Sequence, residues 1–419
     1  MGKERSPFTP GRPVDVEFFV GRAQELALIT RAASQVAAGR NENLFITGER
    51  GIGKSSLAAL ARELLEKDYR LLGTHCYVGR VSSLDEMCRT VWRALLEQLP
   101  RGLFAKVEEY VKRYMTEAQL GMFGFGVRVR VTEDPRVLSE LRLEFPQRLG
   151  ELYARLREDC AGLVLILDDL NGVVLLPEFA RFLKSVVDEL ASQRAGSFPL
   201  LLMLVGLPEC MDTLRTHHES VPRIFTPILL RPLSEDESKS FFRRAFESVG
   251  TEVEEGALAV LHHFGGGLPT FLHEIGDAAY WADEDNRIDG EDAWRAVLMA
   301  ADRVGAKYLH RRVYEAIRSE AYRRLLRTLA RDFYGLPLTR RDILRALSDK
   351  DKKTFANFLT RMRQLGVLRP GDTRGRYEFA SEMERVYFWL EAYRAQREAE
   401  QSRRANPPKA KRAKQGSRR

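Results

Sequence analysis

The stretch Gly48-Glu49-Arg50-Gly51-Ile52-Gly53-Lys54-Ser55 follows the phosphate-binding loop pattern GxxxxGK[ST] in full. An apolar run at residues 43–47 leads into it as a buried strand would, and apolar side chains at residues 57–64 then repeat at helical spacing. The glycines of such a loop let backbone N–H groups curl around a phosphate, while the lysine supplies charge and the serine offers a hydroxyl to Mg²⁺. The sequence therefore predicts a nucleotide site at a helix N-terminus, where the dipole and the free amides favour an anion.

A second apolar run, Gly162 to Leu167, ends in the acidic pair Asp168-Asp169. A central parallel strand that is buried on both faces has this composition, and carboxylates at its tip lie where a metal and an attacking water are needed. We assign Asp168 to the shell of Mg²⁺, through water, and Asp169 to the role of catalytic base or water-orienting group. The plainer alternative is a pair of acids that caps a turn.

The segments between these two motifs predict an α/β fold. A strand at 71–78 and a helix at 84–99 continue the alternation, so we expect a P-loop NTPase parallel sheet with helices on both faces. The stretch Gly121 to Val131 changes to period-two alternation with clustered glycines and predicts an inserted β-hairpin. With Arg128 and Arg130 this hairpin could contact DNA or a neighbouring subunit, or it could pack on its own domain.

The alternation of strands and helices stops after Pro232. Residues 234–237 have a capping-box pattern and open a small all-α unit, and helices at 339–347 and 352–365 then precede a pair of strands at 366–370 and 376–380. That order predicts a winged helix-turn-helix, which could bind DNA or protein. The residues placed at DNA are Lys353, Asn357, Arg361, Arg374 and Arg376.

The predicted organisation has five parts. They are an extended leader (1–14), an α/β unit (15–232, with the hairpin at 121–131), a helical unit (233–310), a winged helix (311–394) and a basic disordered tail (395–419).

Length and composition agree with a multidomain protein of the cytoplasm. The chain has 419 residues, which predicts two or three domains. No apolar run approaches the roughly 20 residues that span a bilayer, and the N-terminus is charged and proline-rich rather than hydrophobic, so no membrane association is expected. The four cysteines form no CxxC pair and have no histidine at zinc spacing, so we expect reduced core residues.

The net charge of +8 is concentrated at the C-terminus, because residues 401–419 carry eight Lys or Arg and no Asp or Glu. This segment is rich in Pro, Lys and Arg and almost lacks large apolar side chains, which predicts disorder. A phosphate-binding arm and a solubilising tail would have the same composition.

Taken together, the motifs resemble the AAA+/STAND group of P-loop ATPases, especially the branch of archaeal-type ATPases and origin-recognition-like proteins. The resemblance covers roughly residues 15–390 and includes the phrase Phe19-Val20-Gly21-Arg22, which it places at the adenine, and Gly267-Leu268-Pro269, which it places in a lid. It implies ATP and Mg²⁺ as ligands, with Ser55 and Asp168 at the metal. The implied nucleotide-binding residues are Val20, Gly21, Arg22, Gly48, Glu49, Arg50, Gly51, Ile52, Gly53, Lys54, Ser55, Ser56 and Pro269.

Two departures from this group concern catalysis. AAA+ ATPases usually have Glu where Asp169 stands and a polar sensor residue where Gly206 stands, so we expect slow hydrolysis of ATP to ADP and phosphate. The catalytic residues would be Asp169, Lys54, whose charge lies at the outer phosphates, and Arg223. Arg223, with Arg215 as second candidate, would act in a neighbouring subunit as an arginine finger. An ordinary surface ion pair is the commoner role of an arginine.

The leading hypothesis is an ATP-dependent switch that forms a homo-oligomer or recruits a protein partner and associates with DNA. The alternative is a regulatory scaffold that binds ATP structurally and uses the winged helix to hold a protein effector. A small-molecule kinase is disfavoured because no acceptor-base motif is present, and GTP because no NKxD-type motif is present.

Overall fold

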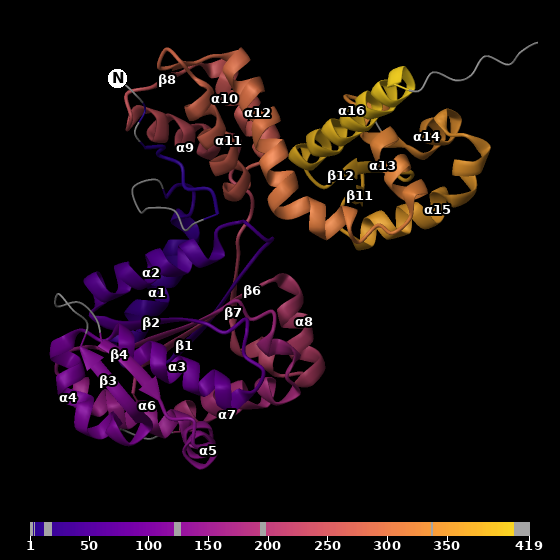
Figure 1. Ribbon diagram of the computed structural model, residues 1–419. Helices are drawn as coiled ribbons and strands as arrows, with labels where there is room; N and C mark the ends of the chain where they lie inside the picture. Colours follow the sequence, from indigo (N-terminus) through magenta and orange to yellow (C-terminus); the bar gives the residue numbers. More distant parts are fainter. Residues whose placement is uncertain are drawn as a thin grey trace, which may run out of the picture. The chain divides into compact units, whose positions relative to one another are not determined.

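The chain forms two compact units (Figure 1). The computed structural model describes residues 3, 5–11, 19–120, 127–192, 198–336 and 338–405. Residues 11–232 form an α/β unit, and residues 1–10 join residues 233–419 in a mainly helical unit.

A parallel sheet in the order β2-β5-β6-β1-β7 organises the α/β unit. The strands are β1 (Glu42–Thr47), β2 (Leu71–Tyr77), β5 (Gly162–Asp168), β6 (Leu200–Gly206) and β7 (Thr226–Leu229). Every residue of β5 and β6 is buried, as expected for central strands covered on both faces. The predicted fold class, a P-loop NTPase sheet followed by a helical region, is confirmed.

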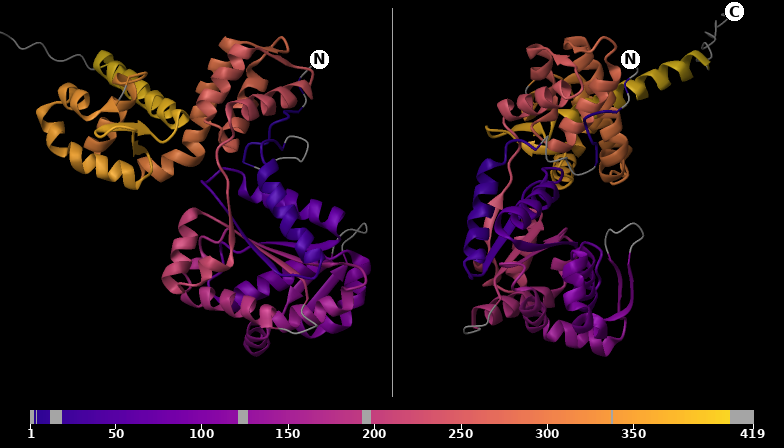
Figure 2. Two further views of the ribbon diagram at one scale, coloured as in Figure 1. Left: turned by 180° about the vertical axis from the view of Figure 1, so that it is seen from behind. Right: turned by 90° about the vertical axis from the view of Figure 1, so that its left-hand side faces the viewer.

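Helices cover both faces of this sheet. Phe45, Leu165 and Leu202 belong to one large core that also contains side chains of α3, α6 and α7. Helices α1 and α2 lie against the strands on the other face (Figure 2). The helices of the unit are α1 (Ala23–Ala37), α2 (Lys54–Tyr69), α3 (Leu84–Gln98), α4 (Arg101–Val111), α5 (Pro135–Leu143), α6 (Phe145–Leu156), α7 (Pro177–Ser192) and α8 (Pro208–His217).

An antiparallel pair of strands lies in the region of the predicted hairpin. It consists of β3 (Met115–Leu120) and β4 (Val127–Val131), so its first strand precedes the predicted segment. Residues 121–126 of the prediction lie outside the described residues. Val129 and Val131 are buried in the main core, which favours packing on the same domain over an exposed contact surface for this strand.

The second unit begins with four helices: α9 (Glu235–Glu247), α10 (Glu255–Gly265), α11 (Pro269–Ala282) and α12 (Gly290–Val304). The predicted capping box at Ser234 is present, because its hydroxyl accepts from Glu237 N–H while the Glu237 carboxylate accepts from Ser234 N–H. The all-α expectation is wrong in one detail, since the short strands β8 (Glu252–Val253) and β9 (Arg287–Ile288) pair in parallel. A π-helical segment, Gly305–Tyr314, continues α12 across the boundary predicted at residue 310.

The N-terminal residues pack on these helices. Phe8 is buried among Phe241, Phe246 and His273, and the backbone N–H of Thr9 donates to Nδ1 of His273 at 3.1 Å. A Cβ at residue 276 would lie 2.3 Å from the Phe8 ring, so only glycine at that point of α11 leaves room for the ring. Phe8 is therefore an integral part of the helical core.

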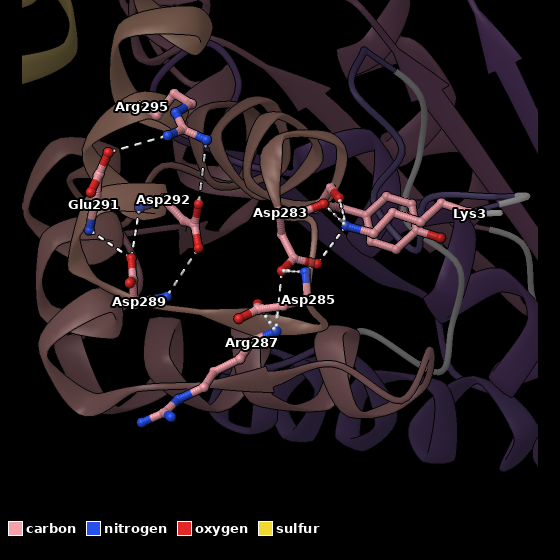
Figure 3. Close-up of polar contacts among 9 residues, drawn as sticks. Lys3, Asp283, Asp285, Arg287, Asp289, Glu291, Asp292 and Arg295 are labelled. Atoms are coloured by element: carbon pink, nitrogen blue, oxygen red, sulfur yellow. Dashed lines mark hydrogen bonds and ion pairs between the residues drawn. The ribbon is translucent and has the colours of Figure 1, made fainter. Parts of the chain in front are cut away.

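Lys3 anchors the same segment at the end of α11 (Figure 3). Its ammonium donates to the backbone carbonyls of Tyr280 and Asp283 and to the Asp283 carboxylate, which is fully buried. Burial raises the pKa of Asp283, but the Lys3 ammonium and the backbone N–H groups of Arg287 and Asp285 oppose it, and the net pKa lies below its ordinary value. A cation at a helix C-terminus also interacts favourably with the helix dipole.

The C-terminal part has the order helix, strand, helix, helix, strand, strand, helix. Its elements are α13 (Glu320–Asp332), β10 (Leu338–Thr339), α14 (Arg340–Ala346), α15 (Asp349–Gln364), β11 (Leu368–Pro370), β12 (Arg376–Phe379) and α16 (Glu382–Ala405). The three strands form an antiparallel sheet in the order β10-β12-β11. Helix α16 replaces the disorder expected at 395–405, because Ala, Glu, Gln and Arg dominate there and all favour helix. Residues 406–419 lie outside the described part.

All four cysteines, Cys76, Cys88, Cys160 and Cys210, are buried and free, as predicted. In the described ranges, no helix has the length and apolar character that a membrane crossing requires.

Candidate nucleotide site

The phosphate-binding loop joins β1 to α2. Gly48, Gly51 and Gly53 all have positive φ, at 150°, 82° and 93°, which is the backbone region that other residues rarely adopt. A Cβ at residue 48 would lie 2.8 Å from the carbonyl oxygen of Leu230, so the first glycine also permits the loop to approach the end of β7. The pattern of glycines thus has a steric cause.

Lys54 is the first residue of α2 and folds back over the loop. Its ammonium donates to the carbonyls of Gly48 and Glu49, each at 2.8 Å. Burial lowers its pKa, while the negative charge of Asp168 acts in the opposite direction. The ammonium therefore lies at the loop in a partly desolvated position where an anion would be an additional partner.

The other loop residues divide into two kinds. Ser55 and Ser56 follow Lys54 in the first turn of α2, where free backbone amides accumulate. Glu49 and Arg50 are exposed at the tip, whereas the side chain of Ile52 is fully buried. Ile52 can therefore contact a ligand only through its backbone.

Arg22 holds the loop from outside. Its guanidinium donates to the carbonyl of Ile52 at 3.2 Å and to that of Arg231 at 2.8 Å, and the residue is only 6% exposed. The neighbouring Gly21 has φ 72° and Val20 is half-buried. The geometry gives Arg22 a role in positioning the loop relative to the end of the β7 strand.

Asp168 ends β5 and is 2% exposed. One carboxylate oxygen, Oδ1, accepts from the backbone N–H of Asp169 at 2.7 Å, and Oδ2 lies 2.9 Å from Nε2 of His75. An ionised carboxylate can only accept, so Nε2 carries the hydrogen. Each oxygen thus has one protein donor and keeps acceptor capacity for a metal-bound water.

Asp169 is exposed and has φ 58°. Its Oδ1 accepts from the side-chain amide of Asn171 at 2.5 Å, and its Oδ2 lies against Gly79, where a Cβ would be only 2.0 Å away. The Asn171 oxygen in turn accepts from the thiol of Cys210 at 3.3 Å. The carboxylate proposed as the base is therefore tied to its own loop.

Gly206 lies beside the loop entrance, because β6 pairs with β1 in a register that places it opposite Thr47. A Cβ at this position would approach the sulfur of Cys210 to 3.1 Å. The neighbouring strand thus presents no side chain at the point where a polar sensor residue is usual.

The remaining predicted residues lie elsewhere in the chain. Pro269 occupies the first turn of α11 in the helical unit. The side chain of Arg223 is 78% exposed, with Glu219 at 3.8 Å, whereas Arg215 pairs with Asp212 at 2.7 Å and is 56% exposed. The side chain of Arg223 is thus more exposed and more weakly paired than that of Arg215.

The residues placed at DNA do not share one environment. Lys353, Asn357 and Arg374 are exposed, the first two on α15 and the third between β11 and β12. Arg361 is half-buried, donates to the carbonyl of Ala316 at 3.1 Å and lines a cavity of about 560 Å³, so part of its donor capacity is already used within the protein. Arg376 is also half-buried, with its Nε enclosed.

The sequence interpretation missed His75, Gly79 and Asn171. A histidine inside an otherwise apolar strand was the available signal for His75, since a buried polar side chain needs a partner. Gly79 and Asn171 follow strand ends in irregular loops and carried no pattern.

Comparison with known proteins assigns the first unit to a family. Residues 19–210 match the family described as AAA ATPase domain. No curated protein sequence matches the chain. This part of the chain is therefore similar to an AAA ATPase domain, and the protein is a nucleotide-binding ATPase.

Two solved structures share the fold. The Walker-type ATPase paby2304 of Pyrococcus abyssi is 18% identical, covers 90% of this chain and 98% of its own, and has a TM-score of 0.52. The ORC2 protein of Aeropyrum pernix, solved as ADPNP-ADP complexes, is 15% identical, covers 94% of this chain and 99% of its own, and has a TM-score of 0.57. Such likeness extends over most of both units, but it concerns the fold alone.

Proposed function

We propose that the protein is an ATP-binding switch that hydrolyses ATP slowly, in the manner of STAND-type ATPases. The observation that carries the proposal is the tethered Asp169, whose carboxylate is bound to Asn171 and lies against Gly79. A base must be able to move to the attacking water, and the hydrogen bond from Asn171 holds the carboxylate in its own loop. Gly206 adds to the effect, because this position at the end of β6 has no side chain that could contact the attacked phosphate.

In this proposal the loop binds ATP through backbone amides and Lys54. When bound, Mg²⁺ would supply charge neutralisation at the outer phosphates. Ser55 and Asp168 fit such an ion, since they offer a hydroxyl and a buried carboxylate with free acceptor capacity. Arg22 would transmit the state of the loop to the backbone at Arg231, next to the boundary between the units.

Nucleotide-dependent assembly is the second element of the proposal. Arg223 would reach a neighbouring subunit, because it is exposed and only loosely paired. The test is the specific ATPase rate as a function of protein concentration. We expect the rate to rise with assembly, the Arg223→Ala variant to lose the rise, and the paired Arg215→Ala to keep it. A rise that survives Arg223→Ala would contradict this assignment.

DNA association through the C-terminal elements is the third element. Their order and the β10-β12-β11 sheet support a winged helix with α15 as its recognition helix. We expect Lys353→Glu with Arg374→Glu to weaken DNA binding and to reduce its salt dependence, whereas the exposed Lys112→Glu of the other unit would change neither. DNA binding by the chain truncated after residue 400 would show how much of the affinity depends on the basic tail.

The alternative is a scaffold that binds ATP structurally and holds a protein effector. It draws on the same tethered Asp169 and on Gly206. Wild-type protein that binds ATP through Lys54 but shows no hydrolysis at any concentration, and no salt-dependent DNA binding, would favour the scaffold. Unaltered ATP binding by Lys54→Ala would contradict both functions.

A further inference from the structure

His75 contacts Asp168, the first residue of the acidic pair, from the neighbouring strand. It belongs to β2, an edge strand of the sheet, and its side chain is 7% exposed. Its Nε2 donates to Oδ2 of Asp168 at 2.9 Å. The contact joins two nearly buried side chains from adjacent strands, so it is not a surface pair.

The direction of the His75 side chain follows from the sheet. A Cβ on Gly73, two residues earlier, would meet the side chain of Arg62 on α2 at 2.5 Å, so Gly73 and His75 face α2. Tyr77 pairs in register with Asp168, which points to the same face. His75 therefore reaches Asp168 on the side of the sheet where α2 begins with Lys54.

The backbone of His75 also has partners on the side of β2 where no neighbouring strand lies in the described part of the chain. Gln98 of α3 accepts from the His75 N–H at 2.9 Å and donates to its carbonyl at 2.8 Å, which replaces the missing neighbour strand. The ring of Tyr77 stacks on the imidazole at 4.9 Å. These contacts fix both the position of the residue and the plane of its ring.

We infer that His75 is a positioning residue for the ATPase reaction, which fixes the carboxylate of Asp168 in the orientation that receives the Mg²⁺–nucleotide complex. The inference rests on the proposed function. With Asp169 N–H on Oδ1 and His75 on Oδ2, rotation of the carboxylate is blocked from both sides. Partners of this kind order a ligand before the ion arrives, and their loss typically reduces metal affinity or activity about 10–100-fold.

The test uses the full chain and the free Mg²⁺ concentration. His75→Leu keeps the volume and removes the donor, so we expect the Mg²⁺ concentration for half-maximal ATPase rate to rise about 10–100-fold. Binding of a fluorescent ATP analogue in EDTA should stay at the wild-type level. His75→Gln, whose amide nitrogen can reach the same oxygen, should restore the Mg²⁺ dependence to within about threefold. Thr74→Val is the matched control, because Thr74 is buried on the opposite face of β2.

An unchanged Mg²⁺ dependence in His75→Leu, or equal losses in the Leu and Gln variants, would overturn the inference. If the Leu variant fails to fold, His75→Asn takes its place, since its amide is too short to reach Asp168. Nucleotide binding that is indifferent to Lys54→Ala would overturn the proposed function, and the inference with it. A Lys54-dependent site with normal Mg²⁺ dependence in His75→Asn would overturn the inference alone.

Discussion

The packing of Phe8 on α11 predicts that Gly276→Ala destabilises the protein when Phe8 is present and stabilises it when Phe8 is replaced by alanine. Gly276→Ala places a methyl carbon 2.3 Å from the Phe8 ring, so either the ring or the helix must move. Removing a buried phenylalanine side chain costs about 3–5 kcal/mol, and we expect about 3 because a segment near the chain end can relax. Gly276→Ala should approach the same loss, since it expels the ring.

The same alanine should stabilise the protein once the ring is absent. In a Phe8→Ala background the new methyl group has space, and alanine in a helix interior is favoured over glycine by about 0.5–1 kcal/mol. The two substitutions are thus expected to couple by about 4 kcal/mol. The wild-type and Phe8→Ala backgrounds differ only in whether a phenylalanine ring packs on α11.

Scanning calorimetry is the assay, because it can separate the unfolding of the two units. Gly256→Ala in α10 is the control, since a Cβ there meets nothing within 4 Å. It should be neutral or slightly stabilising in either background. If Gly276→Ala raised the transition temperature equally with and without Phe8, the docking of the N-terminal segment would be refuted.

Three further predictions concern the loop, the base and pH. Arg22→Lys loses the two-carbonyl contact and should weaken binding of a fluorescent ATP analogue about tenfold, and unchanged affinity would count against the positioning role. Asn171→Ala frees the Asp169 carboxylate and should raise kcat by roughly threefold to tenfold, the equivalent of one hydrogen bond, whereas a lower or equal kcat would show that the tether does not limit hydrolysis. Because the pKa of Asp283 is lowered in the folded state, ionised Asp283 stabilises the protein above the ordinary carboxyl pKa, and this stabilisation is lost as pH falls through the folded-state pKa. Lys3→Met should therefore reduce the fall in melting temperature at acidic pH, as measured by thermal melts at several pH values.

Much of the fold followed from local patterns. The spacing of Gly48, Gly51 and Gly53 predicts the loop, since the required positive φ values restrict those positions to glycine. The six apolar residues before Asp168 predict a central strand, and the strand is buried throughout. The loop and the strand can be predicted from sequence because the residues that determine each conformation lie within the same short segment.

Other features could not be predicted, because their contacts join distant segments. The guanidinium of Arg361 on α15 donates to the carbonyl of Ala316, which no spacing within the helix indicates. The leader contains ordinary loop residues, yet Phe8 became part of a core because Gly276, far along the chain, leaves room for it. No local pattern contains the second partner.

The sequence by itself determined that the chain has a phosphate-binding loop, a buried strand ending in two carboxylates and a parallel sheet that unites them. These depend on backbone conformation and hydrophobic periodicity, which are local properties. Only the tertiary structure decided how the carboxylates are held: Asp168 by His75 from the neighbouring strand, and Asp169 by Asn171 and Gly79. The orientation of a buried polar group is set by the partners that satisfy it, and the fold brings those partners from other strands and loops.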